Sequence, residues 1–389
     1  MMVPPRRWIA LAAALSVAAV LHAGAQAPLS RLSDQEFWNL VTDASEPGGA
    51  FHSDNFTSNE AGFAAVAGTL AAAGPHGGAY LGVGPEQNFH YIAAIRPAVA
   101  VLFDIRRQAV VQHLLYKALF ELSRSREEFI ARLFSVAVPD RVDPKAAPEA
   151  LWRGFRIGPG DDRARLSANI AEVKTYLTRT RGFALSDEDL KSLEYVYEAF
   201  FRFGPEIDYA GDTRKLSTGN TNFFKLTSAV DGGGVPRSFL ASDASFQFIR
   251  SMHSRNLIVP IQADFGGPKA LRVVGEFLRG KGLSVSAFYI SNVEQYLFNP
   301  RMPAAPNGFE INGGWRAFYD NLATLPADNS TILLRVPLGN TSTVVTRRMP
   351  DGTVRTEPRL AEFCPLLPFL AAVRDGKITT QSQANGCGR

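Results

Sequence analysis

Short apolar runs that alternate with helix-like segments constrain the fold of this chain more than any other feature. The stretch "AVAVLFDI" (98–105) is apolar almost throughout, which is typical of a strand buried on both faces. Between such runs, residues 106–123 carry apolar side chains at spacing four, as a helix with a buried side does. Further apolar runs stand at 79–83, 256–265, 283–291 and 330–338. This alternation predicts an α/β protein with a doubly wound, mostly parallel sheet.

Residues from about 140 to 235 interrupt the alternation. Pro and Gly punctuate "VDPKAAPEA" (142–150), and "SDEDLKSLEYVYEAFFRF" (186–203) has a helical pattern. We therefore predict one α/β domain over 26–389 that carries a mostly helical insertion at about 140–235 and a C-terminal tail at about 365–389. Near its start, Ser33 with Glu36 three residues later predicts a capped helix.

The N-terminus has the order of a secretory signal peptide. Arg6 and Arg7 precede an apolar stretch at 8–21, and the small-residue site Ala23-Gly24-Ala25 follows. We expect residues 1–25 to be removed, which leaves no stable membrane span and predicts a periplasmic or secreted protein. A plain N-terminal anchor helix is the alternative. The arginine pair also allows export by the twin-arginine route, and the sequence does not separate the two routes.

Charge and cysteine content exclude some functions. The formal charge is +4, but Lys and Arg form no run longer than two, so the sequence does not indicate nucleic-acid binding. The six histidines are dispersed, and we expect no metal site. The two cysteines are Cys364 and Cys387. In an oxidising compartment they would pair and hold the tail to the body, whereas two free thiols are the alternative.

A glycine loop is the main candidate for ligand binding. Gly82 and Gly84 lie between the first apolar run of the alternation and the helix that follows it, where an open α/β sheet binds its ligands. Glycine permits a positive φ and a close approach to the backbone. The third glycine of the dinucleotide-binding pattern is absent, because Gln87 occupies its position. A plain strand–helix turn is therefore the alternative.

Polar residues at the ends of other apolar runs extend this candidate site. Asp104 stands twenty residues after Gly84, where an acid can bind ribose hydroxyls, and Asp264 ends a later strand. Ser291 and Asn292 follow the next strand. The remaining candidates, which we assign to substrate binding, are Asp54, Asn55, Asn59, Glu60 and Arg106. The first four lie in the polar stretch "HSDNFTSNE" (52–60), which could instead be a capping loop, and Arg106 could be an exposed helix-start residue.

This layout resembles the class I S-adenosylmethionine-dependent methyltransferase fold. More closely, the chain resembles an uncharacterised family of bacterial proteins with that fold, in "HSDNFTSNE", "YLGVGPEQNFHYIAAIRP", "FDIRRQAVVQHLLYKALFELS", "NLIVPIQADFGGP" and "YISNVEQYLF". The resemblance implies S-adenosylmethionine as the candidate cofactor, a small molecule as the main partner, and methyl transfer to an unknown acceptor. The cofactor-binding residues that it implies are Gly82, Gly84, Glu86, Asp104 and Asp264.

The chain departs from working methyltransferases at several positions. Tyr80 stands where they usually carry an acid, and Glu86 stands where they carry a third glycine. The sequence identifies no general base. The catalytic candidates are Asn292, Tyr289 and Glu86. Export also conflicts with a cofactor that is kept inside the cell. A non-catalytic exported binding or scaffold protein that retains the fold is therefore the competing hypothesis, and Asp104→Ala would separate the two.

Overall fold

The computed structural model describes most of the chain after the predicted signal peptide. The described residues are 29–49, 51, 53–60, 62–73, 76–140, 143, 145–157, 162–210, 221–298, 314–336, 344–348, 354–358 and 361–388. The predicted signal peptide, with Arg6, Arg7 and the site at 23–25, lies outside these residues.

A six-stranded, mostly parallel sheet forms the centre of the molecule, as predicted. Its order is β3-β2-β1-β4-β5-β8, in which the first five strands are parallel and β8 is antiparallel to β5. The strands are β1 (Ala79–Val83), β2 (Val99–Asp104), β3 (Ile258–Gln262), β4 (Val285–Ser291), β5 (Ile332–Arg335) and β8 (Glu362–Pro365). The chain runs outward from β1 to β3 and returns to the other side of β1, so the topological switch point lies between β1 and β4.

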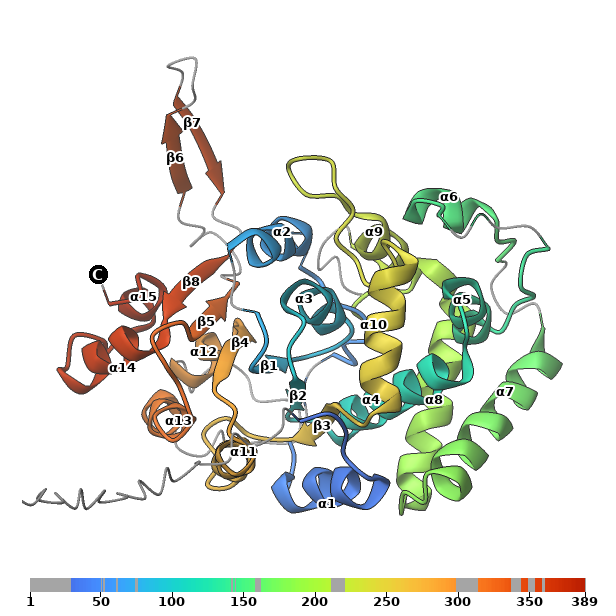
Figure 1. Ribbon diagram of the computed structural model, residues 1–389, viewed down its shortest axis with the longest axis horizontal. Coiled ribbons are helices and arrows are strands. Elements are labelled where there is room, and N and C mark those ends of the chain that lie inside the picture. Colours follow the sequence, from blue (N-terminus) through green and yellow to red (C-terminus); the bar gives the residue numbers. More distant parts are fainter. Residues whose placement is uncertain are drawn as a thin grey trace, which may run out of the picture.

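Helices cover both faces of this sheet (Figure 1). One face carries α3, α4 and α10, and the other carries α1, α11 and α13. These helices are α1 (Asp34–Ala44), α3 (Gln87–Ile95), α4 (Arg107–Leu122), α10 (Asp243–Ser254), α11 (Ala270–Gly280) and α13 (Gly314–Leu322). All six residues of β2 are buried, because helices lie on both of its faces. The predicted capping box of Ser33 and Glu36 begins α1.

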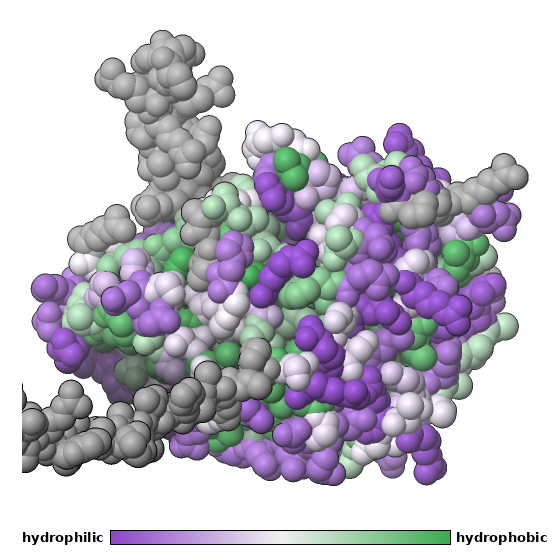
Figure 2. All heavy atoms as spheres, in the orientation of Figure 1, coloured by the Kyte–Doolittle hydropathy of each residue, from purple (hydrophilic) through white to green (hydrophobic). Residues whose placement is uncertain are grey.

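The remaining elements are shorter or lie outside the two main layers. They are α2 (Phe63–Ala73), α5 (Arg126–Phe134), α12 (Val293–Phe298), α14 (Leu366–Arg374), α15 (Gln381–Asn385) and a separate antiparallel pair of strands, β6 (Val344–Arg348) and β7 (Val354–Pro358). Purple and green residues are interspersed over much of the face drawn in Figure 2.

The described part of the segment from 140 to 235 is largely helical. It contains α6 (Pro148–Arg153), α7 (Arg163–Thr175), a π-helical turn (Tyr176–Thr180), α8 (Asp187–Phe203), a 3-10 turn (Gly204–Glu206) and α9 (Phe223–Ser228). Helix α8 packs on α4 through an apolar side that includes Leu193, Val196 and Phe200. At its start Asp189 accepts two hydrogen bonds from Arg107, 2.8 and 2.9 Å long, which join this segment to the sheet domain.

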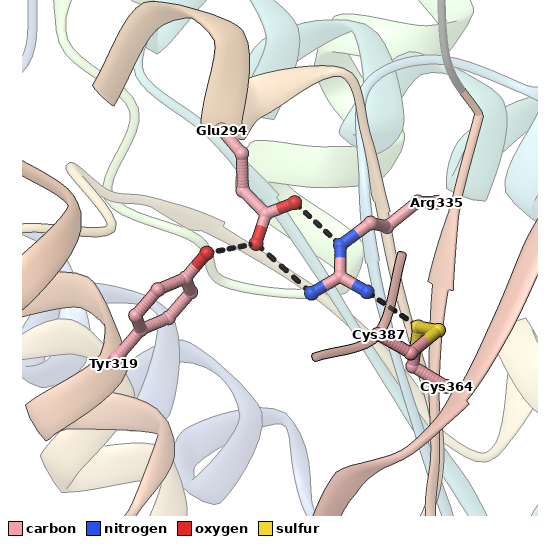
Figure 3. The surroundings of a disulfide bond; sticks show 5 residues. All are labelled: Glu294, Tyr319, Arg335, Cys364 and Cys387. Carbon is pink, nitrogen blue, oxygen red and sulfur yellow. Dashed lines mark hydrogen bonds and ion pairs between the residues drawn. A yellow bond between two sulfur atoms is a disulfide. The ribbon is translucent and has the colours of Figure 1, made fainter. Parts of the chain in front are cut away.

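A disulfide between Cys364 and Cys387 joins β8 to the end of the chain, as predicted, with 5.5 Å between the two Cα atoms. Beside it, the buried Arg335 forms an ion pair with Glu294, and its Nη1 lies 2.7 Å from the Cys364 sulfur (Figure 3). Tyr319 donates to the same carboxylate. Within the described residues, no helix has the length and apolar character that a membrane span requires.

Candidate functional site

The two loop glycines are required for different reasons. A Cβ on Gly82 would lie 1.9 Å from Asn88 Oδ1 and 2.8 Å from the Tyr80 ring, so packing alone demands glycine there. Gly84 has a φ of +84°, and no described atom lies within 4 Å of the position that its Cβ would take. Of the two, only Gly84 therefore offers space for a ligand against the backbone.

Asn88 stabilises the glycine loop through hydrogen bonds to its backbone. Its Oδ1 accepts a 2.8 Å hydrogen bond from the Tyr80 hydroxyl, and its Nδ2 donates to the carbonyls of Val83, Gly84 and Pro85. His113 Nε2 also lies 2.9 Å from the Gly84 carbonyl oxygen. Burial lowers the pKa of His113 to about 4, so the ring is neutral at neutral pH and can donate Nε2–H to this carbonyl.

Glu86 fills the position at which the resemblance implies a third glycine. The side chain is fully buried immediately before α3, and Oε1 accepts a 3.3 Å hydrogen bond from the Ser58 amide. Oε2 has no hydrogen-bond partner among the described residues. Burial raises the pKa of Glu86 to about 8, so this group is mostly a neutral carboxylic acid at pH 7. Glu86 is therefore not a carboxylate base in this state.

Asp104 is held by Arg106 at the end of β2. Arg106 donates to Oδ1 from its amide and from Nε, each at 3.0 Å, and to Oδ2 from Nη2 at 2.9 Å. A carboxylate has about four lone-pair positions, so about one remains for a further donor. Arg106 is itself 7% exposed, and its Nη1 donates to the carbonyls of Ser53 and Asp54. Its guanidinium thus ties the 53–60 segment to the sheet.

Asp264 lies two strands away from the glycine loop. Its Oδ1 accepts a 2.9 Å hydrogen bond from the amide of Gly266 in the loop that follows β3. The adjacent start of α11 is capped by Glu46, whose Oε1 accepts from the amides of Lys269 and Ala270 at 2.6 and 2.5 Å. Sequence reasoning missed Glu46, because its partners lie more than 220 residues along the chain.

The polar segment 53–60 crosses the carboxyl edge of the sheet. Asp54 Oδ2 accepts a 3.0 Å hydrogen bond from Tyr195 of α8, which holds Asp54 toward the helical segment. Asn55 has a left-handed φ of +50°, and Asn59 is half-buried. Glu60 reaches β4, where Oε1 accepts a 2.5 Å hydrogen bond from Ser291. Of the four predicted substrate-binding residues in this segment, Glu60 is the one shown to contact the end of β4.

A buried hydrogen-bond network surrounds Glu60 at the switch point. Gln87 Nε2 lies 2.6 Å from Glu60 Oε2, 2.9 Å from the Tyr91 hydroxyl and 3.0 Å from the Tyr289 hydroxyl. Burial raises the pKa of Glu60, while hydrogen bonds from Ser291, Gln87 and Tyr289 oppose that shift. Burial also raises the pKa of Tyr289 well above its usual value, which keeps its hydroxyl protonated. Sequence reasoning missed Gln87, although "PEQN" places three polar residues in succession between an apolar strand and an apolar helix.

The catalytic candidates therefore differ in their surroundings. Tyr289 is buried within the Glu60 network, and Glu86 is buried beside Ser58. Asn292 is half-buried, its Oδ1 lies 3.3 Å from Ser291 Oγ, and its Nδ2 donates to Gln295 at 3.3 Å. The structure thus brings Gly84, Glu86, Glu60, Tyr289 and Asn292 to the β1–β4 region, whereas Asp54 and Asp264 lie over other elements.

The described residues contain two further features of the kind that can form a site, a group of metal-ligand residue types and a surface hollow. The group Glu362, Cys364 and Cys387 brings three ligand-type atoms within 4.8 Å of one another. Its two sulfurs are bonded to each other, whereas metals bind the thiolate form. A hollow of about 450 Å³ lies between α5, α7 and the end of α4, and its lining includes Arg124, Arg132 and Glu172. No predicted site residue lines it.

The fold and this polar edge define a doubly wound α/β protein with a candidate site at the switch point. The chain belongs to the family described as "Domain of unknown function (DUF7790)", which it matches over residues 55–139 and 221–351, more than half of its length. The predicted membership of an uncharacterised family is thereby confirmed. The matched ranges contain β1 to β5, the glycine loop, Glu60 and Ser291. No curated protein matches the chain.

Proposed function

We propose that the protein binds an adenosyl- or nucleotide-like small molecule at the carboxyl edge of the sheet, against Gly84. The observation that carries the proposal is the left-handed Gly84, with no described atom within 4 Å of its Cβ position, beside the β1–β4 switch point. Open α/β sheets bind ligands outside the carboxyl ends of their strands at such points. S-Adenosylmethionine is the first molecule to test, since the sequence resembles its methyltransferase family.

Asp104 limits how such a ligand would bind. Because Arg106 occupies three of its lone-pair positions, Asp104 could accept one hydrogen bond from a ribose hydroxyl and not two. The strand order and the position of Asp104 at the end of β2 support a ribose near this edge. Methyl transfer to an unknown acceptor would be a further step, in which the bound ligand and the acceptor are aligned at this edge.

We also propose that the protein is exported. The signal-like residues 1–25 and the disulfide between Cys364 and Cys387 support this proposal, because disulfides persist in oxidising compartments. A cofactor made inside the cell would then have to leave with the folded protein, as twin-arginine export allows. A nucleotide-like ligand other than S-adenosylmethionine would remove the conflict.

Native mass spectrometry with a pair of glycine variants tests the binding proposal. Gly84→Asn places a side chain in the open space, and asparagine tolerates left-handed backbone better than most residues. Gly77→Asn is the matched control, since Gly77 has a φ of +74°, no described atom within 4 Å of its Cβ position, and a place before β1. We expect a stoichiometric adduct with S-adenosylmethionine or S-adenosylhomocysteine in the parent protein and in Gly77→Asn, and its loss in Gly84→Asn.

Asp104→Asn provides a second measurement, with folding checked by circular dichroism because the change weakens the Arg106 pair. We expect ligand affinity to fall by about 1–2 kcal/mol if one charge-assisted hydrogen bond is lost. A well-folded parent protein that gives no adduct with either adenosyl compound or with simple nucleotides would overturn the proposal. That result would favour the competing hypothesis, a non-catalytic exported binding or scaffold protein.

A further inference from the structure

Ser291 has an unusual backbone at the end of β4. Its φ is +50°, and the pairing of β4 with β5 shifts register between Tyr289 and Ser291. Serine rarely adopts a left-handed conformation, and residues held in this way cluster at functional sites. A register irregularity of this kind re-aims a side chain near a strand end. Here the strand turns within two residues into α12, so Ser291 stands at a sharp strand–helix turn.

The Ser291 hydroxyl is directed at a buried carboxyl group. Its Oγ donates a 2.5 Å hydrogen bond to Glu60 Oε1, although the two residues are 231 positions apart in the sequence. Gln87 Nε2 holds the other Glu60 oxygen at 2.6 Å. Glu60 is 5% exposed, whereas Ser291 is half-buried. The hydroxyl of this partly exposed residue is therefore bound to a desolvated acid, and its oxygen also lies 3.3 Å from Asn292 Oδ1.

This arrangement meets two geometric requirements for an activated serine. A hydroxyl becomes a nucleophile when an adjacent base can take its proton and a third group orients that base. Glu60 is within hydrogen-bond reach of Ser291, and Gln87 orients Glu60. A carboxyl whose pKa is raised by burial is a better proton acceptor near neutral pH than a solvated one.

We propose that Ser291 is a nucleophile toward carboxylic esters, with Glu60 as the base that accepts its proton and Gln87 as a positioning residue. Glu60 and Ser291 both lie in the ranges matched to the family. The proposal goes beyond the ligand-binding proposal and does not depend on it, because the reaction needs no adenosyl group.

The step is a balanced acyl transfer. Ser291 Oγ forms a bond to the ester carbonyl carbon while its proton passes to Glu60 Oε1. The carbon–oxygen bond to the alcohol then breaks, and Glu60 returns the proton to the departing alkoxide. Water attacks the resulting acyl-serine and gives one proton to Glu60. The acyl–Oγ bond breaks, the carboxylic acid leaves, and Glu60 reprotonates Ser291.

Covalent labelling of the full chain with a fluorophosphonate tests this proposal. The probe reacts with activated serines and contains no nucleotide, so its outcome is independent of adenosyl binding. Intact mass and peptide mapping should show one adduct, located on Ser291, and none in Ser291→Ala. Ser330 is the matched internal control, because its exposed hydroxyl donates a 2.6 Å hydrogen bond to Asp328 without a left-handed φ. We expect no adduct on Ser330.

The variant Glu60→Gln tests whether Glu60 acts as a general base toward Ser291 or only holds its hydroxyl by a hydrogen bond. We expect labelling to slow by about 10²-fold or more, since a positioned general base contributes that much. The pH profile of labelling in the parent protein, which needs no variant, should follow a single ionisation. Absence of label on Ser291 in folded parent protein overturns the proposal, as does equal labelling of Ser291 and Ser330 or a rate independent of pH. Should Glu60→Gln fail to fold, the parent profile and the Ser330 comparison still decide.

Discussion

At the scale of single residues, the glycine loop shows that one motif can serve two purposes. Gly82 makes room for the contact between Tyr80 and Asn88, while Gly84 supplies the left-handed turn and the space beside it. The pattern G-x-G predicted the position of the loop. It could not separate the two roles, because the close contacts of Gly82 come from side chains whose positions the tertiary packing sets.

Glu86→Gln should remove the part of the pH dependence of stability that comes from Glu86. The folded protein holds Glu86 protonated up to a pKa of about 8, whereas an unfolded chain loses that proton near the usual value of 4.5. Its contribution to stability is therefore present below pH 4.5 and is lost as the pH rises toward 8. We expect Glu86→Gln to gain more than about 1.4 kcal/mol over the parent protein between pH 5 and pH 8, the equivalent of one pKa unit.

Urea unfolding at the two pH values measures this difference. Glu149→Gln is the control, because Glu149 is exposed and its replacement leaves the buried group in place. An identical pH dependence in the parent protein and in Glu86→Gln would contradict the expected protonation of Glu86.

At the scale of elements, residues 45–49 and 53–60 contact several strands along the carboxyl edge of the sheet. The Glu46 amide donates to the Gln262 carbonyl at 3.0 Å, and the Gly49 amide donates to the Ile105 carbonyl at 2.9 Å. Further along, Ser58 and Glu60 contact the start of α3 and the end of β4. The sequence indicated a polar segment near the site, but its contacts with β2, β3 and β4 follow from how the loops meet at this edge.

Glu46→Ala should destabilise the protein through α11. Glu46 accepts hydrogen bonds from the first amides of that helix, so its removal leaves them without that acceptor. We expect a loss of about 0.5–2 kcal/mol in chemical denaturation, and Glu46→Gln should lose only about 0.3–1 kcal/mol, since it keeps an acceptor oxygen but not the charge. Glu276→Ala, on the exposed side of α11, is the control. Equal losses for Glu46→Ala and Glu276→Ala would show that the cap contributes nothing measurable.

At the scale of the whole molecule, three buried histidines from separate helices share one aromatic core. His113 of α4 and His253 of α10 pack against Phe89, and Phe120 stacks on His253 with 4.9 Å between ring centroids. His90 of α3 stacks on Phe63 and Phe239, and Phe239 also contacts Phe89. Burial lowers their pKa values, to about 3 for His90 and to about 4 for His113. The core therefore holds three neutral rings that an unfolded chain would protonate in mild acid.

His253→Phe should weaken the acid sensitivity of the fold. As the pH falls below about 6.5, the unfolded chain binds protons that the folded histidines do not, and stability falls by up to about 1.4 kcal/mol per pH unit for each ring. Both ring nitrogens of His253 lack a hydrogen-bond partner in the described residues, so phenylalanine removes one proton-binding site from the unfolded chain without breaking a described bond. We expect a shallower slope of unfolding free energy between pH 6.5 and pH 5. Met252→Leu on the same helix should keep the parent slope; an unchanged slope in His253→Phe would contradict the assignment.

The sequence alone determined the parts of this protein that depend on neighbours along the chain. Apolar runs such as 98–105 predicted buried parallel strands, and Ser33 with Glu36 predicted the start of α1, because periodicity and capping act over a few residues. The pairing of Cys364 with Cys387 was predicted from the presence of only two cysteines together with a signal-like N-terminus, and the structure confirms it.

Only the tertiary structure decided what the candidate site residues touch. Arg106, predicted to bind a substrate, donates hydrogen bonds to Asp104 and to the carbonyls of Ser53 and Asp54. Glu60, predicted as one polar residue among four, is bound by Ser291 from 231 residues away. A side chain's residue type states which bonds it can make, but its partner is whichever group the packed strands and loops place within about 3 Å. That distance is a property of the assembled sheet edge and not of any local segment.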